Sequence, residues 1–360
     1  MEQNVNQLKN RDYWFDNVKG FLMITVVVGH LIASVLNKFP DFVFLSNFIY
    51  SFHMPAFAII SGFFMKRRVD NKDYSSVINK IIVPYLIAQI FIYVVGMVLP
   101  DGVKALSLER FAESGVFTFT VPIYHLWYFV GMIIAFFYCV SSNAKNHPVR
   151  AMVIASVISL VSGFLPSITF LKLTKIAGFL PFFVLGYVLP KDKMYLLKNK
   201  KRYFAPSIVV FLVVIAVFWF LKDEGTLTGI FAMTSRYGKF GFSFLSVVDM
   251  LIRFGYIVAS IVMTFSLMGL SPCKKTPLSK LGERSVYIYV LHVIIVAVIR
   301  HFNYETHFLS EMQTPWLRAL YVLFGVLICF VLVSKPVIKA FKPLLEPDFD
   351  IRNVIKYISQ

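Results

Sequence analysis

The feature that most constrains the fold of this chain is a series of long apolar runs separated by short basic segments. The 360 residues are 58% hydrophobic and only 15% charged, whereas a soluble domain carries about 25% charged residues. An apolar run of about 18 residues or more is long enough to cross a bilayer as a helix, and a helix satisfies its own backbone there. The sequence therefore predicts an all-α, polytopic integral membrane protein.

The apolar runs predict about ten transmembrane helices and divide the chain into three parts. We expect a cytoplasmic N-terminal segment at 1–17, a transmembrane domain at 18–334 and a cytoplasmic tail at 335–360. The polar start lacks the apolar core of a signal peptide, so we expect the first span to be retained. The predicted spans are 18–36, 42–64, 81–99, 121–141, 151–165, 176–190, 204–221, 244–270, 285–302 and 316–334.

The net charge of +17 is explained by the membrane, and we expect no nucleic-acid partner. Most Lys and Arg residues fall in alternate connecting segments, as the positive-inside rule requires. With the N-terminus inside, this bias predicts that both termini are cytoplasmic. The three cysteines have no metal-binding spacing, and no His or acidic cluster is typical of a metal site, so we expect no metal.

Two histidines, His30 and His53, lie within the first two apolar runs. His30 lies ~18 Å from the inner end of its span and His53 ~16 Å from the inner end of the next, so the two imidazoles are expected at one depth. An ionisable group inside a membrane is by default a functional-site hypothesis. Asp16 and Lys19, at i and i+3, are expected to pair. Alternatively, Lys19 extends to the lipid headgroups.

Segments around these residues resemble a known family. RDYWFDNVKGFLMITVVVGHL resembles the opening of the integral-membrane acyltransferases called acyltransferase family 3, in particular the fucose 4-O-acetylase-like branch. Asp16, Lys19 and His30 occupy the places of its aspartate, its basic residue (often arginine) and its catalytic histidine. In the same order, similarity continues through SFHMPAFAIISGFFMKRR, INKIIVPY, HLWYFVGMI, FLPFFVLGY and LGERSVYIYVLHVI. The resemblance covers about 10–335.

The resemblance implies an enzyme of the cell membrane that transfers an acyl group, usually acetyl from acetyl-CoA, to a sugar hydroxyl of a cell-envelope glycan. A neutral imidazole can take the proton of the attacking hydroxyl, so His30 is expected to be the general base. The alternative is an acyl-histidine intermediate. His53 would orient the acceptor or donate to the carbonyl oxygen; alternatively, it ties the structure at a kink near Pro55.

Basic residues near the cytoplasmic side are candidates for binding acyl-CoA, which must enter from there because its phosphates cannot cross lipid. Lys66, Arg67 and Arg68 form a basic turn, and Lys80 starts the next span. With Lys19, they are expected to contact the phosphates, since arginine suits bidentate phosphate recognition. The alternative is the ordinary excess of positive charge on the inner side.

Further residues are candidates for the carbohydrate acceptor. Asp249 and Arg253, at i and i+4, are expected to pair and to grip the glycan; the alternative is a structural ion pair. Trp127 would stack on a sugar, unless it belongs to an interfacial aromatic belt. His292, ~10 Å from the inner face, and His125, near the outer interface, are weaker candidates.

Two other classes of protein are alternatives to an acyltransferase. One is a transporter, which would more often show internal repeats, and the other is a membrane subunit without turnover.

Overall fold

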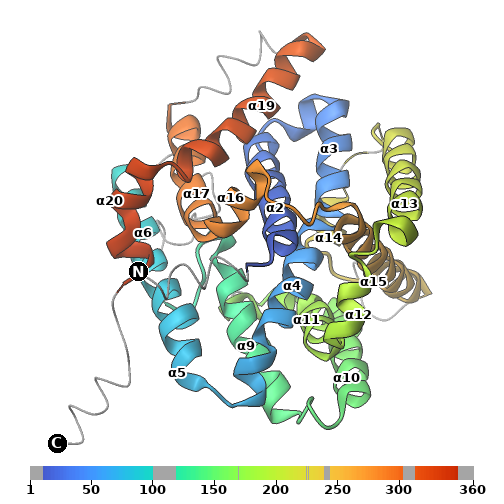
Figure 1. Cartoon of the computed structure of the whole chain (residues 1–360). Helices are drawn as coiled ribbons and strands as arrows, with labels where there is room; N and C mark the ends of the chain where they lie inside the picture. The colour runs from blue at the N-terminus through green and yellow to red at the C-terminus, as the bar shows by residue number, and fades with distance from the viewer. Residues whose placement is uncertain are drawn as a thin grey trace, which may run out of the picture.

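A computed structural model describes residues 11–99, 119–168, 170–223, 225, 227–238, 244–302 and 313–347. Every regular element in these ranges is helical (Figure 1). The α-helices are α2 (Tyr13–Ile32), α3 (Pro40–Tyr50), α4 (His53–Asp70), α5 (Tyr74–Val77), α6 (Val83–Val98), α9 (Trp127–Ser141), α10 (Pro148–Val161), α11 (Leu173–Val188), α12 (Lys191–Leu196), α13 (Lys200–Phe220), α14 (Thr228–Phe231), α15 (Phe244–Leu270), α16 (Pro277–Glu283), α17 (Ser285–His301), α19 (Pro315–Leu332) and α20 (Lys335–Leu345).

The prediction of an all-α, polytopic membrane protein is confirmed. Among the described residues, eight helical stretches are long and apolar enough to cross a membrane, and a ninth is counted if α16 and α17, which meet at 85°, form one bent span. The fifth predicted span corresponds to a shorter apolar helix at Pro148–Phe164. Each of the ten predicted segments is therefore helical, although the second, the fifth and the ninth are not straight, full-length spans.

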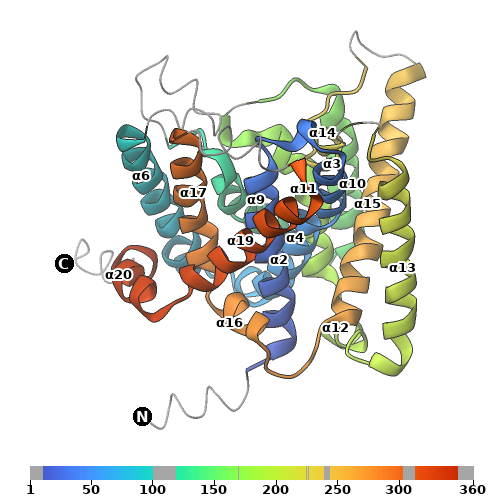
Figure 2. The ribbon, with the colours of Figure 1, turned by 90° about the horizontal axis from the view of Figure 1, so that it is seen from above.

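The helices form a bundle with α13 and α15 side by side at one edge (Figures 1 and 2). Only 11% of the most apolar window of α13 is buried within the protein. Its side chains, such as Val209, Leu212 and Phe220, are exposed, as expected for a lipid-facing helix. Figure 2 shows α12 and α16 at one end of the bundle, and α3 and α14 at the other.

The second predicted span is broken into α3 and α4 at Ser51 and Phe52. A break inside a membrane leaves backbone carbonyls that need partners. The hydroxyl of Ser260 donates to Ser51 O at 2.7 Å, and the hydroxyl of Tyr256 donates to Tyr50 O at 3.4 Å. Two side chains of α15 thus stabilise the break. The break lies before Pro55, which falls in the first turn of α4.

Two helix pairs cross at glycines where the backbones touch. A Cβ on Gly186 of α11 would overlap the carbonyl oxygen of Ile59 in α4, and a Cβ on Gly62 would overlap that of Phe183. Gly20 of α2 and Gly282 of α16 make a second reciprocal contact of this kind. Small residues allow such close packing of membrane helices. These crossings fix α2 and α4, which carry His30 and His53.

Gly186→Ala is expected to destabilise the protein, because backbone atoms of α4 cannot move aside as a flexible side chain can. Overpacking costs about 1–3 kcal/mol, so the apparent melting temperature in detergent should fall by several degrees and the yield of folded protein should drop. Gly255→Ala in α15 is the matched control, since no atom of another helix lies within 4 Å of the position that its added methyl would take. Equal melting temperatures for the two variants would contradict the predicted close crossing.

Candidate functional site

A cavity of about 970 Å³ runs through the centre of the bundle. Its walls come from α2, the α3–α4 break, α4, α9 and the residues just before it, the start of α11, α14 and the start of α17. Lys19 and His30 both lie on α2 and both line the cavity. Lys19 lies at one end of the cavity, and His30 lies about three turns further along the helix. The volume lies at the upper end of the range for small-molecule sites.

The side chain of His30 forms a pair with His292 of α17. The distance from His30 Nδ1 to His292 Nε2 is 2.8 Å, and His292 Nδ1 lies 2.8 Å from Ile288 O. A carbonyl only accepts hydrogen bonds, so His292 Nδ1 carries a proton, and neutral His292 accepts at Nε2. His30 must then donate from Nδ1. This chain of hydrogen bonds leaves Nε2 of neutral His30 with a lone pair, as a general base requires.

The position of His292 differs from the expectation. The span arithmetic placed its imidazole ~10 Å from the inner face, below His30. In the structure its ring is stacked on that of His30, with centroids 5.0 Å apart. The arithmetic took Ser285 to lie at the membrane surface, whereas α17 begins at the 85° bend from α16 and Ser285 lines the cavity. His292 itself is fully buried behind His30 and lies outside the cavity lining.

His125 is a third imidazole beside this pair. Its ring lies 5.1 Å from His292 and 6.4 Å from His30 between centroids. The residue is 6% exposed and lines the cavity, yet neither ring nitrogen has a hydrogen-bond partner among the described residues. A buried polar group without a partner costs about 1–3 kcal/mol. His125 is therefore available to a ligand.

His53 lies at the start of α4 and lines the same cavity. Its Nδ1 donates to Ile49 O across the helix break at 2.8 Å, and its ring meets Tyr50 edge-on at 4.8 Å between centroids. The hydrogen bond gives His53 a structural role at the Ser51–Phe52 break, upstream of Pro55. In the neutral imidazole it also leaves Nε2 as an acceptor, which is compatible with contact to a substrate.

His53→Gln separates these two roles. If the imidazole orients the acceptor, turnover should fall by about tenfold, as for loss of a well-placed hydrogen bond, while the melting temperature changes little. The measurements are acyl-transfer rate per folded molecule and thermal stability of the same preparation. A lower melting temperature with normal turnover would assign His53 to the helix break alone.

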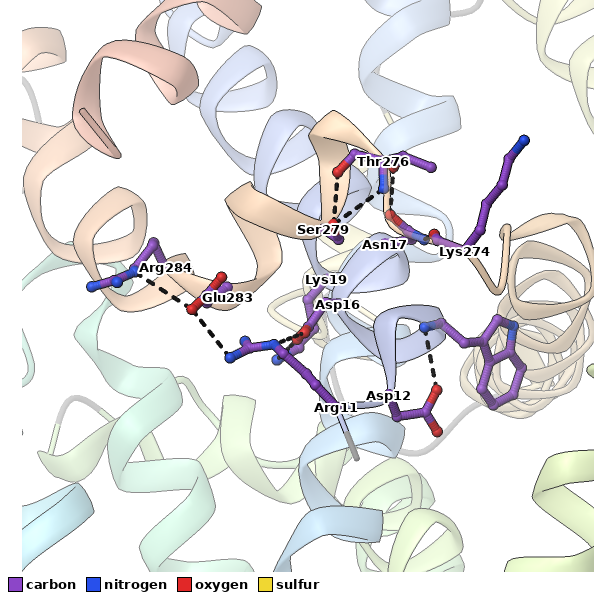
Figure 3. A network of polar contacts seen from close by, with 11 residues as sticks. Arg11, Asp12, Asp16, Asn17, Lys19, Lys274, Thr276, Ser279, Glu283 and Arg284 are labelled. Atoms are coloured by element: carbon purple, nitrogen blue, oxygen red, sulfur yellow. Dashed lines mark hydrogen bonds and ion pairs between the residues drawn. The ribbon is translucent and has the colours of Figure 1, made fainter. Parts of the chain in front are cut away.

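Asp16 and Lys19 form the predicted ion pair, with Lys19 Nζ 2.8 Å from Asp16 Oδ1. Arg11 Nε also contacts Asp16, at 2.7 Å, and Arg11 reaches Glu283 of α16 at 3.1 Å (Figure 3). Asp16 is 5% exposed and does not line the cavity. Its carboxylate therefore positions Lys19, whose side chain does line the cavity, and it has no direct contact with the cavity.

Asn17 completes the connection between α2 and α16. Its amide donates to the carbonyls of Pro272 and Lys274, each at 2.8 Å, and its Oδ1 accepts from Thr276 (Figure 3). At the other end of α2, Arg300 of α17 donates to His30 O at 3.2 Å. Both ends of α2 are thus held by the α16–α17 segment, which also carries His292.

The basic turn lies outside the cavity lining. Lys66 donates to Leu189 O, and Arg68 Nε donates to Ser76 Oγ at 2.9 Å, so both side chains bond to neighbouring helices or turns. Arg67 and Lys80 are exposed. Of the five basic residues predicted to contact acyl-CoA, only Lys19 lines the cavity. A phosphate contact by the other four stays a prediction.

The expected ion pair between Asp249 and Arg253 is wrong. Arg253 turns towards α10, where it donates to Ser159 O and Ser162 Oγ, each at 3.1 Å. Asp249 instead accepts from Gly238 N at 2.9 Å. Arg253 also lies over the ring of Tyr237 and is 3% exposed. The pair does not form because acceptors at α10 compete with the local i, i+4 partner. Neither residue lines the cavity.

Trp127 lines the cavity and is 5% exposed. Its ring lies 5.1 Å from Phe179 between centroids, and Lys175 Nζ lies 4.3 Å from its centroid. This inward position does not fit an aromatic belt facing lipid headgroups.

Among the described residues no group of three His, Cys, Asp or Glu side chains is arranged to hold a metal ion, and the expected absence of a metal stays a prediction.

Sequence reasoning underrated His125 and His292 and did not consider Tyr289. Tyr289 donates to His125 O at 2.5 Å, and its ring packs on the imidazole at 4.7 Å between centroids. The available signal was two further ionisable rings in apolar runs, in HLWYF and YIYVLH. Their meeting at His30 depends on tertiary packing, which no local pattern contains.

The apolar helices define a polytopic membrane protein whose bundle encloses a cavity lined by His30. The chain belongs to the acyltransferase family, since the family model described as "Acyltransferase domain" matches residues 12–334. The resemblance deduced from the sequence is thereby confirmed.

Two relatives carry the name nodulation protein NolL. The protein from Sinorhizobium fredii is 29% identical over 187 residues, which are 50% of this chain and 49% of that protein. The protein from Mesorhizobium japonicum is 33% identical over 85 residues, 23% of each chain. The first match thus spans about half the length of the relative. No solved structure matches the chain.

Proposed function

We propose that this protein is an O-acyltransferase of the cell membrane that moves an acyl group, acetyl in the simplest case, from acyl-CoA to a sugar hydroxyl of a cell-envelope glycan. The observation that carries the proposal is the hydrogen-bond chain from Ile288 O through His292 to His30, which leaves a basic nitrogen at the cavity. Membership of the acyltransferase family supports it.

The donor enters the cavity from the Lys19 end. Under the charge-derived topology this end faces the cytoplasm, where acyl-CoA is made. Lys19 is held by Asp16 at 2.8 Å, so its ammonium is fixed at the cavity wall and can meet a phosphate or the pantetheine chain. The acceptor enters from the opposite end, near the start of α11. The thioester and the hydroxyl then meet at His30.

His30 takes the proton from the attacking hydroxyl at Nε2. The hydroxyl oxygen bonds to the thioester carbon, the carbon–sulfur bond breaks, and the coenzyme A thiolate leaves and receives that proton from His30. The positive charge on His30 during this step is shared through its Nδ1 proton with His292 Nε2, in the manner of an imidazole held by an acceptor. In this mechanism only the protonation state of His30 changes, and no acyl group is bound to the protein.

His125 has the position and one unused N–H donor to bind the carbonyl oxygen on which negative charge develops. Its ring centroid lies 6.4 Å from that of His30, and both residues line the cavity, so one bound carbonyl group can be reached from both imidazoles. Fixed donors in a water-poor site stabilise such an oxyanion. The absence of a partner for either nitrogen within the described part of the chain supports this assignment.

The proposal is tested with purified protein in liposomes, labelled acetyl-CoA and a soluble sugar acceptor. We expect label to appear in an alkali-labile sugar ester, with one coenzyme A thiol released for each ester formed. Uptake of sugar or acetyl-CoA into the liposomes without ester formation would contradict the proposal and favour a transporter. Absence of both activities with every acyl-CoA tested would favour a subunit without turnover.

A further inference from the structure

The charged residues along the cavity are all cationic. Its described lining contains Lys19, Lys172 and Lys175, but no Asp or Glu. Lys19 is balanced by Asp16 just outside the wall. Lys172 and Lys175 lie at the start of α11, which runs parallel to α4, and thus at the end of the cavity away from Lys19. Two lysines thus line this end of the cavity, which is separate from the donor end.

Lys175 lacks an oxygen partner among the described residues. Its Nζ lies 4.3 Å from the centroid of the Trp127 ring, but within that part of the chain it forms no hydrogen bond or ion pair. Other half-buried lysines differ: Lys198 bonds to Asp12 at 2.8 Å, and Lys200 to Gly269 O at 2.6 Å. An ammonium has three donors, and leaving them unused in a half-buried position is costly. An anionic ligand would satisfy them.

The turn before α11 has a strained backbone at the end of the cavity that carries Lys172 and Lys175. Leu171 and Lys172 have positive φ angles of 50° and 54°, a strained conformation for residues with a side chain. Leu171 N is held by Thr120 O at 2.6 Å. The turn directs the chain so that Lys172, Lys175 and the hydroxyl-bearing Ser167 all line the cavity. Strain of this kind persists where the surrounding structure enforces it.

We propose that the acceptor is anionic and that its carboxylate or phosphate binds at the Lys172–Lys175 end of the cavity, with Trp127 packed behind the ammonium of Lys175. The inference rests on the proposed function and adds the charge class of the acceptor. Charge-assisted hydrogen bonds are stronger than neutral ones. They would hold the anionic group while a hydroxyl elsewhere on the sugar reaches His30.

The test compares acceptors that differ in charge. The probes are methyl glucoside, methyl glucuronide and glucose 1-phosphate, each with labelled acetyl-CoA and the full-length protein in liposomes. The wild type should favour an anionic probe by roughly tenfold or more in kcat/KM. Lys175→Gln should remove this preference, because it should lower kcat/KM for the anionic probes much more than for methyl glucoside. The glucuronide and phosphate probes distinguish a carboxylate from a phosphate.

Lys222→Gln is the matched control, because Lys222 Nζ lies 4.0 Å from the ring centroid of Trp219 but does not line the cavity. It should retain the preference. Equal use of neutral and anionic probes by the wild type, or an equal loss for both in Lys175→Gln, would overturn the proposal. If no probe is acetylated, the proposed function fails, but a thermal-shift titration with the same probes still tests the anion site. Stabilisation of the wild type by an anionic probe, with no stabilisation of Lys175→Gln, would support the site. No stabilisation of the wild type by either anionic probe would overturn the proposal.

Discussion

His30→Ala is expected to reduce acyl transfer by at least about 100-fold, because a positioned general base contributes about 10²–10⁴-fold. The contact between Arg300 and the C-terminal end of α2 should survive the substitution, since Arg300 bonds to the backbone oxygen of His30 and not to its ring. The variant should therefore reach the membrane at a normal level. The measurement is the initial rate of ester formation from labelled acetyl-CoA, normalised to folded protein.

His147→Ala is the control for this prediction. His147 is exposed before α10 and lies outside the cavity lining, so its loss should leave the rate unchanged. If His30→Ala transferred acyl groups within about twofold of the wild type, His30 would be a packing residue and the proposed chemistry would be wrong.

His292→Leu is expected to have the second largest effect, a fall in kcat of about 10- to 100-fold. The reason is the Nδ1 proton of His30, which loses its acceptor 2.8 Å away; a buried donor without a partner costs about 1–3 kcal/mol. The imidazole of His30 would then adopt either tautomer, and only one of them carries the lone pair at Nε2. KM for the donor should change little, since His292 does not line the cavity.

His292→Gln is the informative companion, because a glutamine oxygen can accept the same proton and should restore part of kcat. Recovery by glutamine but not by leucine would identify His292 as a positioning residue. Equal losses of kcat in both variants, together with equal losses of folded protein, would indicate that His292 only packs between α2 and α17.

The fold was largely predictable from hydropathy, and two of its departures from the predicted spans have a common physical cause. Apolar runs predicted helices at all ten segments. A kink near Pro55 was considered only as an alternative, so the break at Ser51–Phe52 was not located, and the bend between α16 and α17 was missed. Both lie at contacts with partners far away in the chain. Ser260, for example, lies 209 residues from the carbonyl of Ser51 that it satisfies. Hydropathy measures transfer to lipid and contains no such information.

The candidate site was predictable where the reasoning was local. An imidazole in an apolar run indicated His30, and the i, i+3 spacing gave the Asp16–Lys19 pair. The partner of His30 lies 262 residues away, and its depth could not be counted from a helix that starts inside the bundle. Local spacing also failed for Arg253, where acceptors on α10 replace Asp249.

The catalytic role of His30 is tested most sharply by an experimental structure of the protein with a non-reactive acetyl-CoA analogue. We expect the thioester mimic to lie in the cavity beside His30, with the nucleotide portion towards Lys19 and with His30 bonded to His292. A donor bound elsewhere, or a His30 ring that faces lipid with no passage leading to it, would show that His30 does not meet the thioester.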